Sequence, residues 1–421
     1  MARKMKDSGI EWIGEIPEGW ELVKLKYLSA FPVEKNIDPN SPYIGLENIE
    51  SWSGKYIPSN SQFDKSQALI FSKGDILFGK LRPYLAKVFF AFDSGCCSSE
   101  FCIMTFSSNL NAHYYWNILI SPTFINEVTQ STYGTKMPRA NTDFIRNIFV
   151  PVPSKNDQNQ IAEYLNIECS RIDAILSKTR ASIEEYKKLK QAVITQAVTK
   201  GVRGEREMKD SGVEWIGEIP KEWVIQKIKS ISSRINVGVV IRPSEYFDEN
   251  GTVPFLRGIN VKEYLISSDN MVYINESSNH ILSKSQVHTD DILIVRDGSI
   301  GTSCVVPAEY DGANVVSMVI VTPSISCDSR FICYSLNSDV GKTQFTLTKI
   351  GSALTHTSVS AVSDIIVAVP SCAEQKEIAD YLDAKCAEID KLIAKKEQLV
   401  KELESYKKSL IYEVVTGKRE V

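Results

Sequence analysis

The feature that most constrains this 421-residue chain is an internal duplication. The segment from Met5 to Trp20 recurs from Met208 to Trp223, and only three of its positions differ. The similarity continues beyond this segment, and the offset in numbering grows from 203 to 217, so the second copy is longer inside its globular part. A solenoid needs many short repeats, so two long copies predict two matching structural units.

Each copy begins with a segment of mixed pattern and ends with a long helical one. Short β-rich runs at 88–92, 292–295 and 315–321 are bounded by turn residues, and more helical stretches follow at 111–130 and 328–347. This part of each copy predicts an α+β domain. The expected boundaries are 1–153 for the first α+β domain, 154–200 for the first long helix, 201–370 for the second α+β domain and 371–417 for the second long helix.

Apolar residues spaced three and four apart run along both long helical segments, with Ser154 and Ser371 as caps and Gly201 and Gly417 at the far ends. Helices of about 45 residues would be roughly 65 Å long. The alternative is that each helix packs only on its own domain, but this length favours a coiled-coil-like spacer. The expected seam, which would also serve partner binding, comprises Ile161, Leu165, Ile172, Leu176, Ile183, Tyr186, Ile378, Leu382, Ile389, Ile393, Leu403 and Tyr406.

Composition removes several classes of function. The net charge is −4, so any contact with nucleic acid must come from local patches. The nine cysteines include no Cys-x-x-Cys pair and the four histidines are not spaced as ligands, so neither a metal site nor a disulfide framework is expected. No apolar run approaches the roughly 20 residues that cross a bilayer, and the first residues contain no apolar signal segment. We therefore expect a cytoplasmic protein with no membrane partner.

No catalytic constellation is recognisable. The Gly341-Lys342-Thr343 segment lacks the glycine that a phosphate-binding loop carries five positions earlier. The Asn40-Ser41-Pro42-Tyr43 segment lacks the second proline and the glycine-rich loop of amino-methyltransferases, and no Gly-x-Ser-x-Gly or His-Glu-x-x-His motif occurs. The chain is therefore expected to bind rather than to catalyse, without a cofactor of its own.

Basic and polar loops occupy matching places in the two α+β segments. One loop covers 79–87 in the first copy and 295–301 in the second, and another covers 132–141 and 349–356. Arginine and lysine on such loops suit phosphate contact or bidentate reading of guanine, although a solvated loop is the alternative. The candidate DNA-contacting residues are Lys80, Arg82, Tyr84, Lys87, Tyr133, Thr135, Lys136, Arg139, Asn141, Arg257, Arg296, Ser299, Lys349, Ser352 and His356.

The chain resembles the specificity subunits of type I restriction–modification systems over essentially its whole length. The resemblance rests on Gly-Glu-Ile-Pro-x-x-Trp at the start of each copy, on the segment 74–84, on Gln-x-x-Ile-Ala-x-Tyr-Leu at 158–165 and 375–382, and on 413–418. It implies an α+β protein with two tandem target-recognition domains, separated by two long antiparallel coiled-coil-like helices and related by a pseudo-two-fold repeat. The second copy departs from the Gly-Lys-Leu-Arg-Pro-Tyr pattern, so only Arg296 and Ser299 are carried over there.

The resemblance also implies function and partners. The protein would read a bipartite site in double-stranded DNA without catalysing a reaction itself. It would dock two methyltransferase subunits and also restriction or translocase subunits, and S-adenosylmethionine, ATP and Mg would belong to those partners. Two rivals remain: a fused methyltransferase or nuclease, and a coiled-coil protein-interaction scaffold without DNA readout. An assay of the purified chain with labelled cofactor tests the first, and absence of DNA binding in complex with a methyltransferase would favour the second.

Overall fold

Two long helices organise the chain. The helix α5 spans Lys155–Lys200 and α10 spans Cys372–Val415. Each is followed by a glycine in the left-handed region, Gly201 (φ 76°) and Gly417 (φ 73°), where a residue with a Cβ would be strained. Both helices therefore lie and end where the periodic pattern predicts them.

Serine hydroxyls cap both long helices. The N–H of Asp157 donates to Ser154 Oγ (3.1 Å), and the N–H of Glu374 donates to Ser371 Oγ (3.4 Å). Each bond satisfies one of the N–H groups that a helix leaves without an internal partner. The two predicted caps are confirmed.

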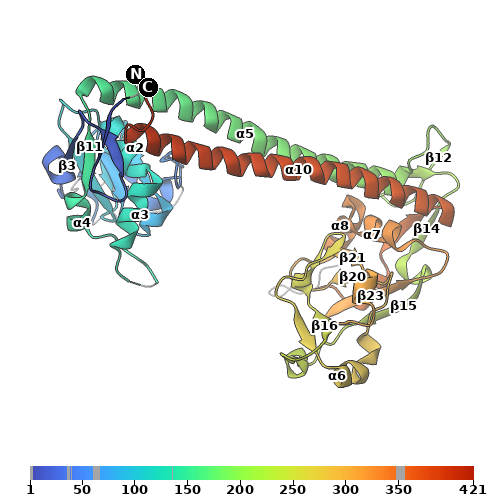
Figure 1. The fold of residues 1–421 in the computed structure, drawn as a ribbon. Coiled ribbons are helices and arrows are strands. Elements are labelled where there is room, and N and C mark those ends of the chain that lie inside the picture. The colour runs from blue at the N-terminus through green and yellow to red at the C-terminus, as the bar shows by residue number, and fades with distance from the viewer. Residues whose placement is uncertain (1–2, 36–37, 39, 60–66, 135, 348–355) are drawn as a thin grey trace. The chain divides into compact units, whose positions relative to one another are not determined.

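The structure, a computed structural model, describes residues 3–35, 38, 40–59, 67–134, 136–347 and 356–421. The chain divides into two compact units (Figure 1). Unit 1 comprises Met1–Arg180 and Glu397–Val421, and unit 2 comprises Ala181–Lys396. Each unit therefore contains one α+β part and a stretch of both long helices. No helix among the described residues is long and apolar enough to span a bilayer.

The α+β part of unit 1 is built on a four-stranded antiparallel sheet of order β4-β10-β7-β8, beside a three-stranded sheet of order β5-β9-β6 and the pairs β1-β2 and β3-β11. Its elements are β1 (Met5–Asp7), β2 (Glu15–Pro17), β3 (Glu21–Lys24), α1 (Leu25–Leu28), β4 (Ser29–Ala30), β5 (Tyr43–Ile44), β6 (Leu69–Phe71), β7 (Ile76–Gly79), β8 (Val88–Phe90), β9 (Gly95–Cys97), β10 (Phe101–Phe106), α2 (Ala112–Ile120), α3 (Pro122–Gln130), α4 (Thr142–Asn147) and β11 (Phe149–Val152).

Unit 2 repeats this plan, with a four-stranded antiparallel sheet of order β15-β23-β20-β21, a three-stranded sheet of order β19-β16-β22 and the pairs β12-β13, β14-β24 and β17-β18. Its elements are β12 (Met208–Asp210), β13 (Glu218–Pro220), β14 (Val224–Lys227), β15 (Ser232–Val237), β16 (Val253–Leu256), β17 (Val261–Lys262), β18 (Leu265–Ile266), β19 (Val272–Ile274), α6 (Glu276–Ile281), β20 (Ile292–Val295), β21 (Ser303–Val305), β22 (Asn314–Val315), β23 (Met318–Pro323), α7 (Ser329–Asn337), α8 (Asp339–Leu347), α9 (Val359–Ser363) and β24 (Ile366–Val369).

Three of the predicted stretches each contain two elements in the structure. The stretches 111–130 and 328–347 each form two helices, because Ser121 and Ser338 adopt extended backbone conformations between them. The last β-rich run is broken at Ser317, whose φ of 49° interrupts the extended chain between β22 and β23. The α+β class and the twofold repetition of the plan are confirmed.

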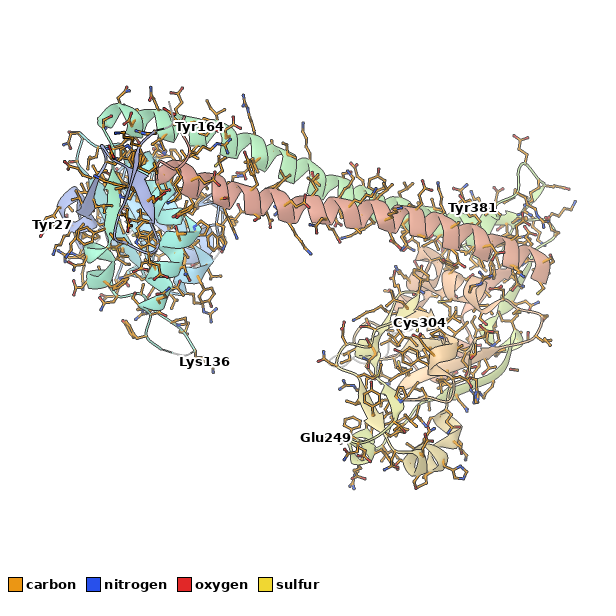
Figure 2. The ribbon with its side chains drawn as sticks, viewed as in Figure 1. Tyr27, Lys136, Tyr164, Glu249, Cys304 and Tyr381 are labelled. Carbon is orange, nitrogen blue, oxygen red and sulfur yellow. The ribbon has the colours of Figure 1, made fainter. Side chains whose placement is uncertain are left out.

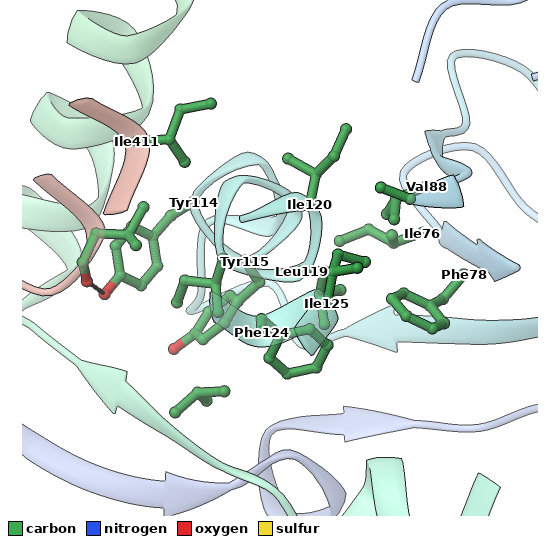
Figure 3. Close-up of a cluster of buried hydrophobic side chains, with 14 of the residues drawn as sticks. Ile76, Phe78, Val88, Tyr114, Tyr115, Leu119, Ile120, Phe124, Ile125 and Ile411 are labelled. Carbon is green, nitrogen blue, oxygen red and sulfur yellow. Dashed lines mark hydrogen bonds between the residues drawn. The ribbon is translucent and has the colours of Figure 1, made fainter. Parts of the chain in front are cut away.

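Aromatic side chains of α2 and α3 fill the core of unit 1. Tyr114, Tyr115 and Phe124 are fully buried, and Ile411 of α10 belongs to the same cluster (Figure 3). Tyr114 Oη also donates to the main-chain oxygen of Val415 (3.0 Å). Apolar packing and this hydrogen bond together hold α10 against the α+β part of the unit.

The repeated opening segment packs on the end of a long helix in each unit. In unit 1, Tyr412 Oη of α10 donates to the main-chain oxygen of Ile13 (3.0 Å), and Trp20 is buried in the same cluster. In unit 2 the matching Trp223 is buried with Ile194 of α5. The repeated opening segment therefore covers the end of one long helix in each unit.

The two long helices run antiparallel in unit 1. Lys407 Nζ lies 2.6 Å from Asp173 Oδ1, and the guanidinium of Arg180 pairs with the carboxylate of Glu404. Later positions on α5 thus meet earlier positions on α10. The predicted antiparallel pairing is confirmed in this unit.

Unit 2 repeats the helix pairing. Lys190 Nζ lies 2.6 Å from Asp390 Oδ2, and Lys396 Nζ lies 5.6 Å from the ring centre of Tyr186. Asp390 matches Asp173 at the offset of 217, and the two lysines that pair with them match at the same offset. The same ion pair is therefore made twice by the duplicated sequence.

Tyr406 departs from the predicted seam, because 48% of its surface is exposed. At the offset of 217 it matches Leu189, which is 49% exposed, whereas Tyr186 corresponds to Leu403. The constant offset of 217 predicts a seam position for Tyr406, and this prediction is wrong because the residue at that position is about half exposed in both long helices. Of the other predicted seam residues, Ile161, Leu165, Ile172, Leu176, Ile183, Ile378, Leu382 and Ile389 are buried, and Tyr186, Ile393 and Leu403 are half-buried.

Candidate nucleic-acid interface

In unit 1 the two predicted loops lie side by side. The N–H of Ala140 donates to the main-chain oxygen of Lys80 (2.9 Å), and the N–H of Arg82 donates to that of Pro138 (2.7 Å). The loop after β7 and the loop before α4 therefore form one surface, which we call the paired-loop surface. Lys136 lies at the tip of the second loop and points away from the body of the unit (Figure 2).

Unit 2 joins its two loops in the same way. The N–H of Thr357 donates to the main-chain oxygen of Arg296 (3.1 Å), at positions that match Ala140 and Lys80. A β-bridge connects Asp297 with His356, and unit 1 has a bridge at the matching positions. The duplicated backbone thus carries a paired-loop surface in each unit, while the side chains on it differ.

Arg82 is the most exposed cation of the loop after β7. Its guanidinium makes no hydrogen bond or ion pair within the described part of the chain, and Tyr84 and Tyr133 of the paired-loop surface are 44% and 61% exposed. Its φ is 51°, and the matching residue in unit 2 is Gly298, whose φ is 79°. The position therefore requires a left-handed backbone, which disfavours arginine.

Three of the predicted DNA-contacting residues in unit 1 have structural partners. Lys87 Nζ donates to the main-chain oxygen of Leu46 (2.7 Å), and Arg139 Nη2 lies 2.5 Å from Glu100 Oε1. Asn141 caps α4 by accepting from the N–H groups of the first turn. These contacts were not readable from the sequence, because they depend on residues that fold next to the loops.

Lys80 is half-buried, beside thiols of the sheet. Burial raises the pKa of Cys97 and Cys102 to about 12, and the positive charge of Lys80 opposes part of that rise. These thiols are uncharged at neutral pH and are therefore poor nucleophiles. Within the described ranges, no group of three or more His, Cys, Asp or Glu side chains could hold a metal ion.

The candidate cations of unit 2 are partly engaged as well. Arg296 Nε donates to a main-chain oxygen (3.1 Å), and the guanidinium of Arg257 donates to another. Ser299 is exposed and His356 is half-buried. Asp297, which sequence reasoning missed, is exposed and puts a negative charge on this surface, where unit 1 has Leu81. Thr135, Lys349 and Ser352 lie outside the described residues.

Comparison with known proteins connects this architecture to one family. Residues 17–185 and 220–402 match the family described as "Type I restriction modification DNA specificity domain". The type I restriction enzyme MjaVIII specificity subunit of Methanocaldococcus jannaschii is 24% identical over 420 residues, which cover 96% of this chain and 93% of the relative.

Solved structures share the fold. A chain from a study of complex assembly and conformational transition of the type I R-M system has a TM-score of 0.77 at 18% identity, covering 95% of this chain and 98% of that one. The HsdS subunit from Thermoanaerobacter tengcongensis has a TM-score of 0.54 at 18% identity, covering 96% and 98%. With two matched segments that together span most of its length, the chain belongs to the family of type I restriction–modification DNA specificity subunits.

Proposed function

We propose that each unit reads one half of a bipartite site in double-stranded DNA through its paired-loop surface. The observation that carries this proposal is the repetition of one backbone scaffold with different side chains, because two readers of different half-sites need a common frame and unlike contacts. Exposed donors such as Arg82, Lys136 and Ser299 supply the groups that bind phosphate or base edges. Methylated bases should be mapped in cells that carry this chain and its methyltransferase.

The mapped site should have two specified parts separated by unspecified base pairs. Substitutions in the loops of unit 1 should change one part only, and substitutions in unit 2 the other. A continuous site, or a site that ignores loop substitutions in a folded protein, would contradict the proposal.

The proposed partners are two methyltransferase subunits, together with restriction or translocase subunits. Exposed apolar residues occur at matching positions of the two long helices. Ile175 (47% exposed) corresponds to Leu392 (36%), and Leu189 (49%) corresponds to Tyr406 (48%), each pair at the offset of 217. Unit 1 carries Ile175 and Tyr406, and unit 2 carries Leu392 and Leu189. Each unit therefore has one residue from each pair, so the chain offers the same docking surface twice.

The proposed role of the chain is recognition without catalysis. S-adenosylmethionine, ATP and Mg would be bound by the partner subunits, and the complex would act in the cytoplasm, where bacterial and archaeal DNA lies. Incubation of the purified chain with labelled S-adenosylmethionine and DNA should give no methyl transfer to the DNA. Methyl transfer should begin when the methyltransferase subunit is added. Transfer by the chain alone would contradict this proposal.

A further inference from the structure

One aromatic residue in each unit occupies a backbone conformation that disfavours it. Trp52 has a φ of 64° and Tyr264 a φ of 70°. The two residues match at an offset of 212, which is also the offset between Asn48 and Asn260. A bulky side chain in the left-handed region is a true outlier, and here both copies of the duplicated sequence keep one.

The main chain at and before these aromatics is hydrogen-bonded within the α+β part of its own unit. The N–H of Trp52 donates to the main-chain oxygen of Ala86 (3.2 Å), and that of Tyr264 donates to Ser303 (3.0 Å). Asn48 and Asn260 are buried just before them and bond to main-chain groups of the same loops. The strained backbone is thus held in place by the surrounding fold.

The rings themselves lie against lysines of the long helices. Lys408 Nζ of α10 is 4.4 Å from the ring centre of Trp52 in unit 1, and Lys190 Nζ of α5 is 5.6 Å from that of Tyr264 in unit 2. Both distances suit a cation–π contact. Lys190 and Lys407, the neighbour of Lys408, are also the lysines of the repeated helix-to-helix ion pair. Each aromatic therefore contacts its helix pair at, or one residue from, the lysine that forms the repeated ion pair.

The two contacts differ in how much else supports them. In unit 2 the ring of Tyr264 packs on Tyr334 with a centroid distance of 4.9 Å, and the hydroxyl of Tyr264 is buried without a hydrogen-bond partner among the described residues. In unit 1 the corresponding space is a cavity of about 1180 Å³, lined by Trp52, His113 and Trp116 among others. Trp52 thus borders an open cavity, whereas the ring of Tyr264 packs on a second aromatic ring.

We infer that Trp52 and Tyr264 are positioning residues, which set the angle at which each paired-loop surface is held against the long helices. The inference rests on the proposed function, in which the helices act as a spacer. If the angle is fixed, the complex accepts one separation between the half-sites. A change of one base pair moves a half-site by about 3.4 Å along the DNA, so a loosened contact should relax this requirement.

The test uses the full complex with its methyltransferase and DNA duplexes in which the mapped half-sites are separated by the natural spacer, by one base pair fewer or by one more. The variants are Trp52→Gly, which removes both ring and strain, and Lys408→Ala, which removes the exposed contact on the helix. Trp52→Tyr, which carries the aromatic of unit 2, is the matched control.

We expect Trp52→Gly and Lys408→Ala to lower the ratio of methylation rates between the natural and altered spacers by about tenfold, whereas Trp52→Tyr keeps the ratio of the unchanged chain. The specified bases of both half-sites should stay the same. Tyr264→Gly should lower this ratio of methylation rates less than Trp52→Gly does, because the contact of Trp52 with the helix lies beside a cavity.

Folded variants that bind methyltransferase and keep the full spacer discrimination would overturn the inference while leaving the proposed function intact. If Trp52→Gly does not fold, Lys408→Ala decides the question alone, because Lys408 is exposed. A complex of the unchanged chain that modifies no bipartite site would instead contradict the proposed function.

Discussion

A second ion pair, between an arginine before the opening segment and a carboxylate in the first turn of a long helix, also occurs in both units, but it is buried in only one of them. In unit 2, Glu374 is 2% exposed and its Oε1 lies 2.7 Å from Arg206 Nη1, whose guanidinium also lies over Trp223. In unit 1 the matching Arg3 and Asp157 are 3.8 Å apart, and about a third of each side chain is exposed. A charge removed from water depends on its partner far more than a charge that keeps its hydration.

Arg206→Ala should therefore destabilise unit 2 by about 3–5 kcal/mol, because it leaves Glu374 buried without its nearest cation. The neighbouring Arg203, 3.8 Å away, would reduce this cost by moving closer. Arg3→Ala should lower the stability of unit 1 by less than about 1 kcal/mol. Urea unfolding followed by hydrogen exchange in each unit measures both, and equal effects would show that burial does not govern this contact.

Arg82 gives a second prediction at the scale of the residue. Arg82→Gly should be more stable than Arg82→Ala by about 1 kcal/mol, because glycine adopts the left-handed conformation freely. Both variants should lose about 1–3 kcal/mol of DNA binding if the guanidinium reads a base, and less if it contacts only phosphate. The loss should be confined to the half-site read by residues 21–150. Thermal unfolding tests the prediction on stability, and methylation mapping tests the prediction on DNA binding. Unchanged methylation would show that this loop is solvated and does not contact DNA.

At the scale of the element, the long helices were the most predictable part of the fold. Their period, serine caps and terminal glycines are local signals, and Ser154 and Gly201 sit where those signals place them. The phase of the seam was less predictable at Tyr406, which the offset of 217 places on the seam although 48% of its surface is exposed. The serines that divide the shorter helices were also missed, because an extended residue inside a helical pattern leaves little trace in the period.

The outer faces of these helices carry the prediction on partners. Ile175→Glu should remove one of two bound methyltransferase subunits, Leu392→Glu the other, and the double substitution both, because a buried carboxylate at either interface has no partner. Lys178→Glu, an exposed change one turn from Ile175, is the control for charge alone. Native mass spectrometry of the assembled complex counts the subunits, and full occupancy with the double variant would move the docking surface elsewhere.

The loops divide clearly into what was predictable and what was not. Their position and their difference between copies are visible in the sequence, and the backbone pairing shows that they form one surface in each unit. Which cations are free was not visible, because Lys87 and Arg139 are held by Leu46 and Glu100, residues distant in sequence. Side-chain partners of this kind arise only after the chain has folded.

At the scale of the whole molecule, we expect the α+β parts to be interchangeable readers on a repeated frame. Replacing residues 224–367 with residues 21–150 keeps both long helices and both opening motifs, and it rejoins the chain within matching strand pairs, β3-β11 and β14-β24. Such a protein should fold and bind the methyltransferase, because the frame is unchanged.

Methylation mapping in cells that express this chimeric protein with its methyltransferase is the most direct test of this expectation. A twofold-repeated protein mirrors its symmetry in the DNA it binds, so the mapped site should be an inverted repeat of the half-site that unit 1 reads. A folded chimera that binds methyltransferase and still modifies the original asymmetric site would show that the α+β parts do not carry the specificity.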